Sequence, residues 1–201
     1  MKHYFLFFFL ILSNCFGQEV SEINKVLEIP DSLEYEQEIR IYKDYSIANK
    51  FEILRMFKDQ NKEWVVYRYW YSKEFKDVTK INVIRFPKEN IGKLKPKNAD
   101  LIWLKILITN VEFLPDMESI RYKFGTPFID SDRGEPAIVN KKILVTDGDA
   151  YKVFVRNEKN KNNFSFNNPK TYLKHYPAVD ELISYNELLS VINKELNLLN
   201  Y

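Results

Sequence analysis

The stretch FEILRMFKDQNKEWVVYRYWYS, residues 51–72, decides the fold of this chain. It consists of two runs rich in aromatic and branched apolar residues, with the polar segment Asp59–Lys62 between them. This pattern predicts two β-strands joined by a short loop. With a four-residue loop, Lys58 is expected opposite Glu63, and that pairing sets the register of the whole hairpin.

The register sorts the hairpin into two faces, because side chains alternate across a strand. One face is expected to carry Phe51, Ile53, Arg55, Phe57, Trp64, Val66, Arg68 and Trp70. The opposite face is expected to carry Leu54, Met56, Val65, Tyr67, Tyr69 and Tyr71. Both sets are largely apolar, so the hairpin must be covered at least partly on both sides.

Two later segments are predicted to be helices that supply this cover. Asn98 suits a helix N-cap, and the residues near 98–110 are apolar nearly all round, which is typical of a buried helix. The residues near 180–199 carry an apolar stripe at helical spacing. Together with the strands, these helices predict an α+β fold with an antiparallel sheet of about six to eight strands.

Two further segments are predicted to add strands to the sheet. In residues 141–156, KKILVTDGDAYKVFVR, the pair Asp147-Gly148 favours a two-residue turn, so a hairpin is expected with Leu144 opposite Tyr151. In the segment Tyr35–Lys43, apolar and charged residues alternate. That alternation predicts a strand with one solvated face, at an edge of the sheet that its charges protect.

Residues 1–17, MKHYFLFFFLILSNCFG, have a basic start, an apolar run and then small residues. This is the layout of a secretory signal peptide, and the apolar run is too short to span a membrane. Cleavage after Gly17 would leave a single domain, residues 18–201, without a transmembrane segment. An alternative is lipoprotein processing, because Leu12–Cys15 resembles a lipobox, although Asn14 stands where Gly or Ala is usual. Either route predicts export to a periplasm or to the cell surface.

Composition excludes several classes of function. The chain has 30 Lys and Arg against 28 Asp and Glu, and removing Lys2, the one Lys or Arg among residues 1–17, leaves 29 against 28. This near balance provides no basic field for nucleic acid. Cys15 is the only cysteine in the chain. If it leaves with the signal peptide, the remaining chain has no disulfide, thiolate metal site or cysteine nucleophile.

The sequence contains no motif for a known catalytic centre. It has no G-x-S-x-G elbow, P-loop, G-x-G-x-x-G or H-E-x-x-H, and His175 is the only histidine beyond residue 3. The run Asp130–Glu135 begins like a calcium loop but lacks the glycine at its sixth position and the glutamate at its twelfth. We therefore assign no catalytic residue, metal ligand or cofactor.

The candidate binding residues are Trp64, Arg68, Trp70 and Arg55, which the predicted register places on one face. Trp and Arg commonly carry interface energy, and a flat aromatic strip also suits sugar rings. In the alternative interpretation these rings stabilise the sheet while the arginines lie over them. The sequence thus predicts an exported, non-catalytic domain that binds a protein or glycan partner. The alternatives are a carboxylate-based envelope hydrolase and a structural envelope component or lipoprotein.

Overall fold

The computed structural model describes residues 15–45, 48–90, 92, 95–132, 134–139, 143, 145 and 148–199. Its strands are β1 (Gln37–Tyr45), β2 (Lys50–Lys58), β3 (Trp64–Ser72), β4 (Asp77–Arg85), β5 (Phe128–Asp132), β6 (Glu135–Val139), β7 (Asp149–Asn157) and β8 (Asn160–Asn167). Its helices are α2 (Cys15–Val26), α3 (Ala99–Ile108), the 3₁₀ helix η1 (Met117–Lys123), α4 (Pro169–His175) and α5 (Asp180–Leu196).

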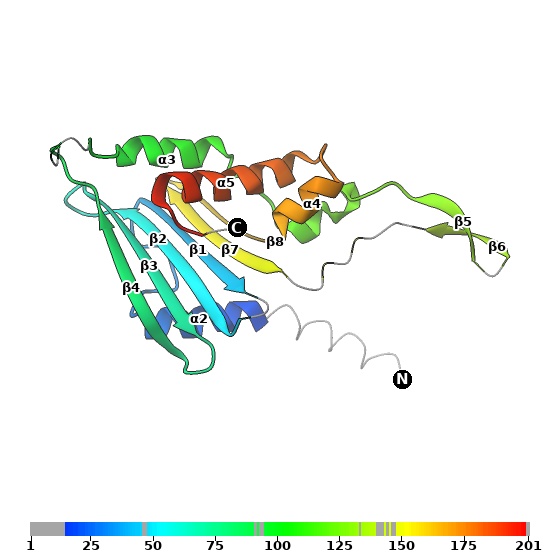
Figure 1. Cartoon of the computed structure of the whole chain (residues 1–201), viewed down its shortest axis with the longest axis horizontal. Helices are drawn as coiled ribbons and strands as arrows, with labels where there is room; N and C mark the ends of the chain where they lie inside the picture. Colours follow the sequence, from blue (N-terminus) through cyan, green and yellow to red (C-terminus); the bar gives the residue numbers. More distant parts are fainter. Residues whose placement is uncertain are drawn as a thin grey trace.

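Six strands form one antiparallel sheet in the order β4-β3-β2-β1-β7-β8, and β5 and β6 form a separate two-stranded sheet. Figure 1 shows α3 and α5 over one face of the larger sheet and α2 against the other. The predicted α+β class, the strand number and the two covering helices are confirmed. Within the described residues, no helix combines the length and apolar character needed to cross a bilayer.

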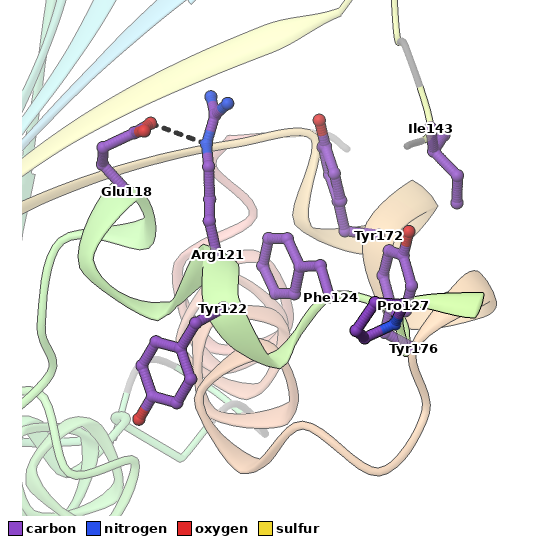
Figure 2. A pocket seen from close by; sticks show the side chains of 9 residues that line it. Glu118, Arg121, Tyr122, Phe124, Pro127, Ile143, Tyr172 and Tyr176 are labelled. Carbon is purple, nitrogen blue, oxygen red and sulfur yellow. Dashed lines mark ion pairs between the residues drawn. The ribbon is translucent and has the colours of Figure 1, made fainter. Parts of the chain in front are cut away.

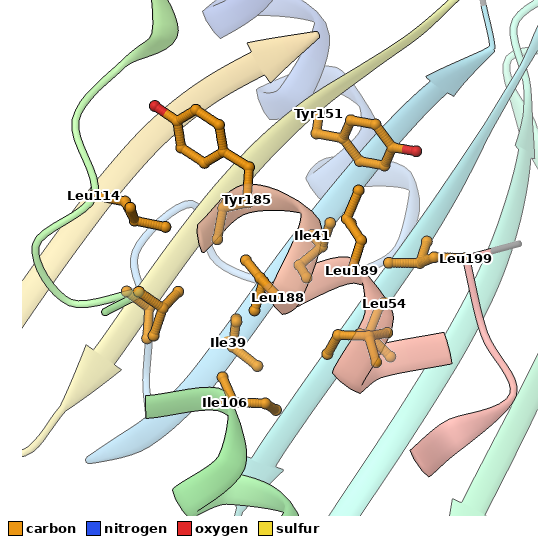
Figure 3. Close-up of a cluster of buried hydrophobic side chains, with 14 of the residues drawn as sticks. Ile39, Ile41, Leu54, Ile106, Leu114, Tyr151, Tyr185, Leu188, Leu189 and Leu199 are labelled. Atoms are coloured by element: carbon orange, nitrogen blue, oxygen red, sulfur yellow. The ribbon is translucent and has the colours of Figure 1, made fainter. Parts of the chain in front are cut away.

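The larger core lies between the sheet and α3 and α5. Figure 3 shows Ile39, Ile41 and Leu54 of the sheet facing Leu188 and Leu189 of α5. All five side chains are buried. A smaller core on the opposite face joins α2 to the sheet through Val20, Ile23, Tyr42, Phe51, Ile53, Tyr69 and Tyr71. The hairpin is thus covered on both sides, as its two apolar faces require.

The predicted register of the β2–β3 hairpin is wrong by one residue. Lys58 pairs with Trp64, not with Glu63. The cause is the loop: the backbone N–H of Asp59 donates to the carbonyl of Glu63 at 2.8 Å, and Lys62 adopts a left-handed φ of 63°. A turn followed by a left-handed residue makes a three-residue loop with a bulge. The slip exchanges the faces of β3 relative to β2.

The sequence predicted β1 at an edge of the sheet. The structure places it at the centre, between β2 and β7. Its charged residues Glu38, Arg40 and Lys43 are consequently buried, and Glu38 has no exposed surface. Buried charges need partners. Lys43 finds one in Asp149, whose carboxylate lies 2.8 Å from its Nζ.

Glu38 is the centre of a buried ion-pair network. Its Oε1 accepts from Nε of Arg40 at 2.7 Å and from Nε of Arg55 at 2.8 Å. Its Oε2 accepts from the backbone N–H groups of Glu34 at 2.8 Å and Tyr35 at 3.0 Å. The network therefore ties β1 to β2 and holds the segment that precedes β1 in place.

The network also shifts the pKa of Glu38. Burial alone raises this pKa, but the charges of Arg40 and Arg55 and the backbone N–H of Tyr35 outweigh burial, so the net pKa is lowered. A lowered pKa in the folded state stabilises the fold at a pH above the unfolded pKa, about 4.3 for Glu. That stability is lost as the pH falls through the folded pKa.

The predicted hairpin 141–156 is wrong in its pairing. Tyr151 of β7 pairs with Lys43 of β1 on one side and Phe166 of β8 on the other, so both edges of β7 are occupied. Leu144, its expected partner, lies outside the described residues. Gly148 is required for a different reason, because a Cβ there would lie 1.6 Å from Oδ1 of Asn168.

We predict that Glu38→Gln lowers the free energy of unfolding by about 3 kcal/mol, because it leaves two buried guanidinium groups without their shared carboxylate. Urea unfolding at neutral pH measures the loss. The exposed Glu36→Gln is the matched control and is expected to change stability by less than about 0.5 kcal/mol. The stability of Glu38→Gln should also fall less on acidification than the stability of the parent chain does. Equal, small effects of both substitutions would contradict the network.

Candidate functional site

The structure places three of the four predicted binding residues on one face of β3, and of these Arg68 and Trp70 are in contact. Trp64, Arg68 and Trp70 share the face of β3 that lies towards α3 and α5, whereas Arg55 points to the opposite face. The one-residue slip of the register causes this separation. Arg55 belongs instead to the Glu38 network, with its Nη2 2.8 Å from Oε2 of Glu34.

Trp64 is a core residue. Its side chain is buried and lies 5.2 Å, centroid to centroid, from the ring of Trp103. Its indole Nε1 donates to Oδ1 of Asp100 at 2.8 Å, and Lys58 also donates to this atom. Because Asp100 is in the first turn of α3, these bonds join the β2–β3 hairpin to the start of that helix.

Trp70 is half-buried, and its indole is flanked by two cations. The guanidinium carbon of Arg68 lies 4.2 Å from a Trp70 ring centroid, and Nζ of Lys80 lies 4.8 Å from it. Arg68 in turn pairs with the buried Glu52 at 2.7 Å. A shallow cavity of about 420 Å³ opens beside Trp70. The binding role of Trp70 and Arg68 stays a prediction.

A second surface was not predicted from the sequence. A cleft of about 490 Å³ lies between η1, α4 and the chain that leads into β5 (Figure 2). Its floor is an aromatic cluster in which Phe124 lies 5.1 Å from Tyr176 and 5.4 Å from Tyr172, between ring centroids. The cleft is lined by Glu118, Arg121, Tyr122, Phe124, Gly125, Pro127, Ile143, Tyr172 and Tyr176.

The rim of the cleft is polar. Nε of Arg121 lies 2.6 Å from Oε2 of Glu118, an ion pair between two exposed side chains. Such pairs contribute little to stability, so both groups are available to a ligand. In Figure 2 the hydroxyls of Tyr172 and Tyr176 point to the same side as the Arg121 guanidinium. The cleft thus combines an apolar floor with hydrogen-bonding groups along one side.

The β5–β6 hairpin, which we call the arm, begins directly after the cleft and projects away from the larger sheet (Figure 1). Ile129 and Ile138 are opposite each other in its register, and both side chains are exposed, as is Phe128. An isolated two-stranded hairpin is at best marginally stable in water. The exposed apolar residues on this element make the arm a candidate interaction surface.

The remaining candidates for chemistry from the sequence are His175 and the calcium-like run. His175 is exposed at the last position of α4. The carboxylate of Asp130, in the calcium-like run, accepts from the backbone N–H of Ser131 at 2.8 Å. The described residues contain no group of three or more His, Cys, Asp and Glu side chains suited to hold a metal ion.

Comparison of the chain with protein-family models, with curated proteins and with solved structures finds no match.

We predict effects of different size for the two tryptophans of β3. Trp64→Ala is expected to lower the free energy of unfolding by about 3–5 kcal/mol, because it empties a core position and removes the indole that donates to Asp100. Trp70→Ala is expected to lower it by about 1–2 kcal/mol, because that ring is only half-buried. Urea unfolding of both variants measures the difference. Equal losses would contradict the placement of these residues.

Proposed function

We propose that this chain is an exported, non-catalytic binding domain, and that it takes a partner protein at the cleft and the arm. The observation that carries the proposal is the continuity of these two surfaces. Phe124 and Pro127 line the cleft, and Phe128 starts the arm immediately afterwards. A single partner segment can therefore contact the aromatic floor and the apolar arm together.

A protein partner fits these surfaces better than a glycan. Sugar rings stack on flat aromatic faces and hydrogen-bond through their hydroxyls, which the cleft by itself could satisfy. Their small C–H faces suit flat aromatic rings better than the branched aliphatic side chains of Ile129 and Ile138, which are exposed. A protein segment supplies apolar side chains for the arm as well as for the cleft. The arm therefore decides between the two partner classes.

The cleft favours one kind of partner segment. Aromatic grooves bind extended, proline-rich or aromatic segments, because such segments lose little conformational entropy on binding. An apolar side chain of the partner would rest on Phe124 and Tyr176, while the hydroxyl of Tyr172 and the guanidinium of Arg121 would bond to its backbone carbonyls. This division of roles uses both the floor and the rim of the cleft.

The proposed export is compatible with the contacts at the start of the fold. Residues 1–14 lie outside the described residues. Among the α2 side chains that the structure describes, Glu19 lies 3.5 Å from Nζ of Lys73 and Val20 is buried. Cleavage after Gly17 would leave these contacts in place. Acylation at Cys15 would keep them too and would add a lipid at the start of α2.

Photo-crosslinking in the native cells tests the proposed site. We predict that benzoylphenylalanine in place of Ile138 gives a discrete protein adduct, and that a second substitution, Tyr176→Ala, removes it. Benzoylphenylalanine in place of Phe75 is the control, because Phe75 is an apolar residue in the connection between β3 and β4, away from the cleft and the arm, and is similarly exposed, 73 % against 81 % for Ile138. Thermal unfolding of each variant checks that the fold is kept.

Three outcomes would contradict the proposed protein-binding site. Adducts from both positions would indicate non-specific contact, and an adduct that survives Tyr176→Ala would exclude the cleft. Binding of an oligosaccharide library that depends on Tyr172 and Tyr176 would favour the glycan alternative.

The intact mass of the chain from the same cells tests export. The proposal expects a start at Gln18 or an acylated Cys15, and an unprocessed chain in the cytosol would contradict it.

A further inference from the structure

The helix α3 has an apolar stripe on its outer face. Its inner side chains, including Ile102, Trp103 and Ile106, are buried against the sheet. Leu101, Leu104 and Ile108 on the outer face are exposed. The sequence predicted a helix buried nearly all round, and the structure covers one side of it. A helix that is apolar on all sides is normally covered on all sides.

The three exposed side chains form one continuous stripe. Positions 101, 104 and 108 fall within about 60° of one another around a helix with 3.6 residues per turn, and they span about 10 Å along its axis. Beside the stripe, a groove of about 390 Å³ separates α3 from α5. Ile108 lies at its edge and the half-buried Val191 lines it. Figure 1 shows both helices over the same face of the larger sheet.

We propose that this stripe is the docking face for α3 of a second copy of the chain. In a two-fold arrangement the two α3 helices run antiparallel, so that Leu104 packs on Leu104 of the second copy and Leu101 packs near Ile108 of the second copy. One patch then serves both sides, as a two-fold interface requires. The antiparallel helices also place the positive end of each helix dipole beside the negative end of the other.

The charges around the groove favour a second copy over a lipid surface. The groove is flanked by two lysines, Lys105 and Lys194, and by two glutamates, Glu187 and Glu195. Lys105 and Glu195 already pair within the chain at 2.6 Å. The balanced set of charges does not repel its own copy, and an antiparallel arrangement can place Lys194 of one copy beside Glu187 of the other. Attachment to an anionic membrane requires an excess of basic residues around the apolar face.

The size of the stripe sets the expected affinity. Three exposed aliphatic side chains offer apolar surface on the order of 300 Å² per copy, against about 800 Å² per partner in a stable interface. The stripe is therefore the core of a small interface, and the groove and its charged rim supply the rest. We expect a reversible dimer with a dissociation constant in the micromolar range.

Sedimentation velocity over a micromolar concentration series tests the proposal, on chains purified in the form that the native cells produce. The parent chain should shift from monomer to dimer, and Leu104→Glu should weaken this association by at least about tenfold. Ile81→Glu on β4 is the matched control, because Leu104 and Ile81 are both 54 % exposed. Ile81→Glu should leave the dimer unchanged.

Other outcomes would overturn the proposal. A parent chain that stays monomeric throughout the series excludes the dimer. Loss of the dimer in Ile81→Glu but not in Leu104→Glu would assign the interface to the edge strand β4. Monomers that bind vesicles containing anionic lipid, with binding lost in Leu104→Glu, would assign the stripe to a membrane. Thermal unfolding of both variants at the parent temperature confirms that the exposed substitutions leave the fold intact.

Discussion

The ion-pair network of Glu38, Arg40 and Arg55 constrains this fold more tightly than any one apolar contact. Its members sit in the middle of the sheet, where an uncompensated charge costs about 3–5 kcal/mol. Glu38 is satisfied by two guanidinium groups and two backbone N–H groups at the same time. This arrangement requires β1 and β2 in one register and the chain before β1 in one path. Apolar packing tolerates small shifts, and this network does not.

The covering helices limit where the molecule can interact with others. The middle of the sheet is enclosed between α2 on one face and α3 and α5 on the other, so it has no free surface for a ligand. Exposed apolar groups lie at the periphery instead, among them those on the outer face of α3, at the cleft beside η1 and on the arm. The proposed binding surfaces therefore lie apart from the residues that stabilise the centre of the fold.

The sequence was sufficient to predict the fold class, the two covering helices and the existence of the first hairpin, because each depends on a periodicity of several residues. It was insufficient for the register, since Lys62 adopts a left-handed conformation that glycine or asparagine usually signals. The central place of β1 was missed for a related reason. Buried ion pairs and solvated charges produce the same alternation along a strand. Arg55, which pairs with Glu38 of β1, lies on another strand, so β1 alone does not reveal the pair.

The cleft could not be predicted because its parts are distant in sequence. Tyr172 and Tyr176 are four residues apart near α4, which suggests a shared helix face, but nothing links them to Phe124 before the fold is known. Gly148 carried a strong turn signal, yet its role is to allow close contact with Asn168. Local patterns thus identify elements, while the partners of those elements depend on the whole chain.

Native-state hydrogen exchange tests most directly whether β1 is the buried centre of the sheet. The amides of Ile39, Arg40 and Ile41 are expected to exchange only through global unfolding, so their protection should equal the free energy of unfolding. The strand β4 is at the edge of the sheet, so one side of it has no neighbouring strand. Some amides of β4, in the part that contains Ile81 and Val83, should therefore exchange faster than those of β1. Exchange of the β1 amides as fast as the fastest β4 amides would contradict the account.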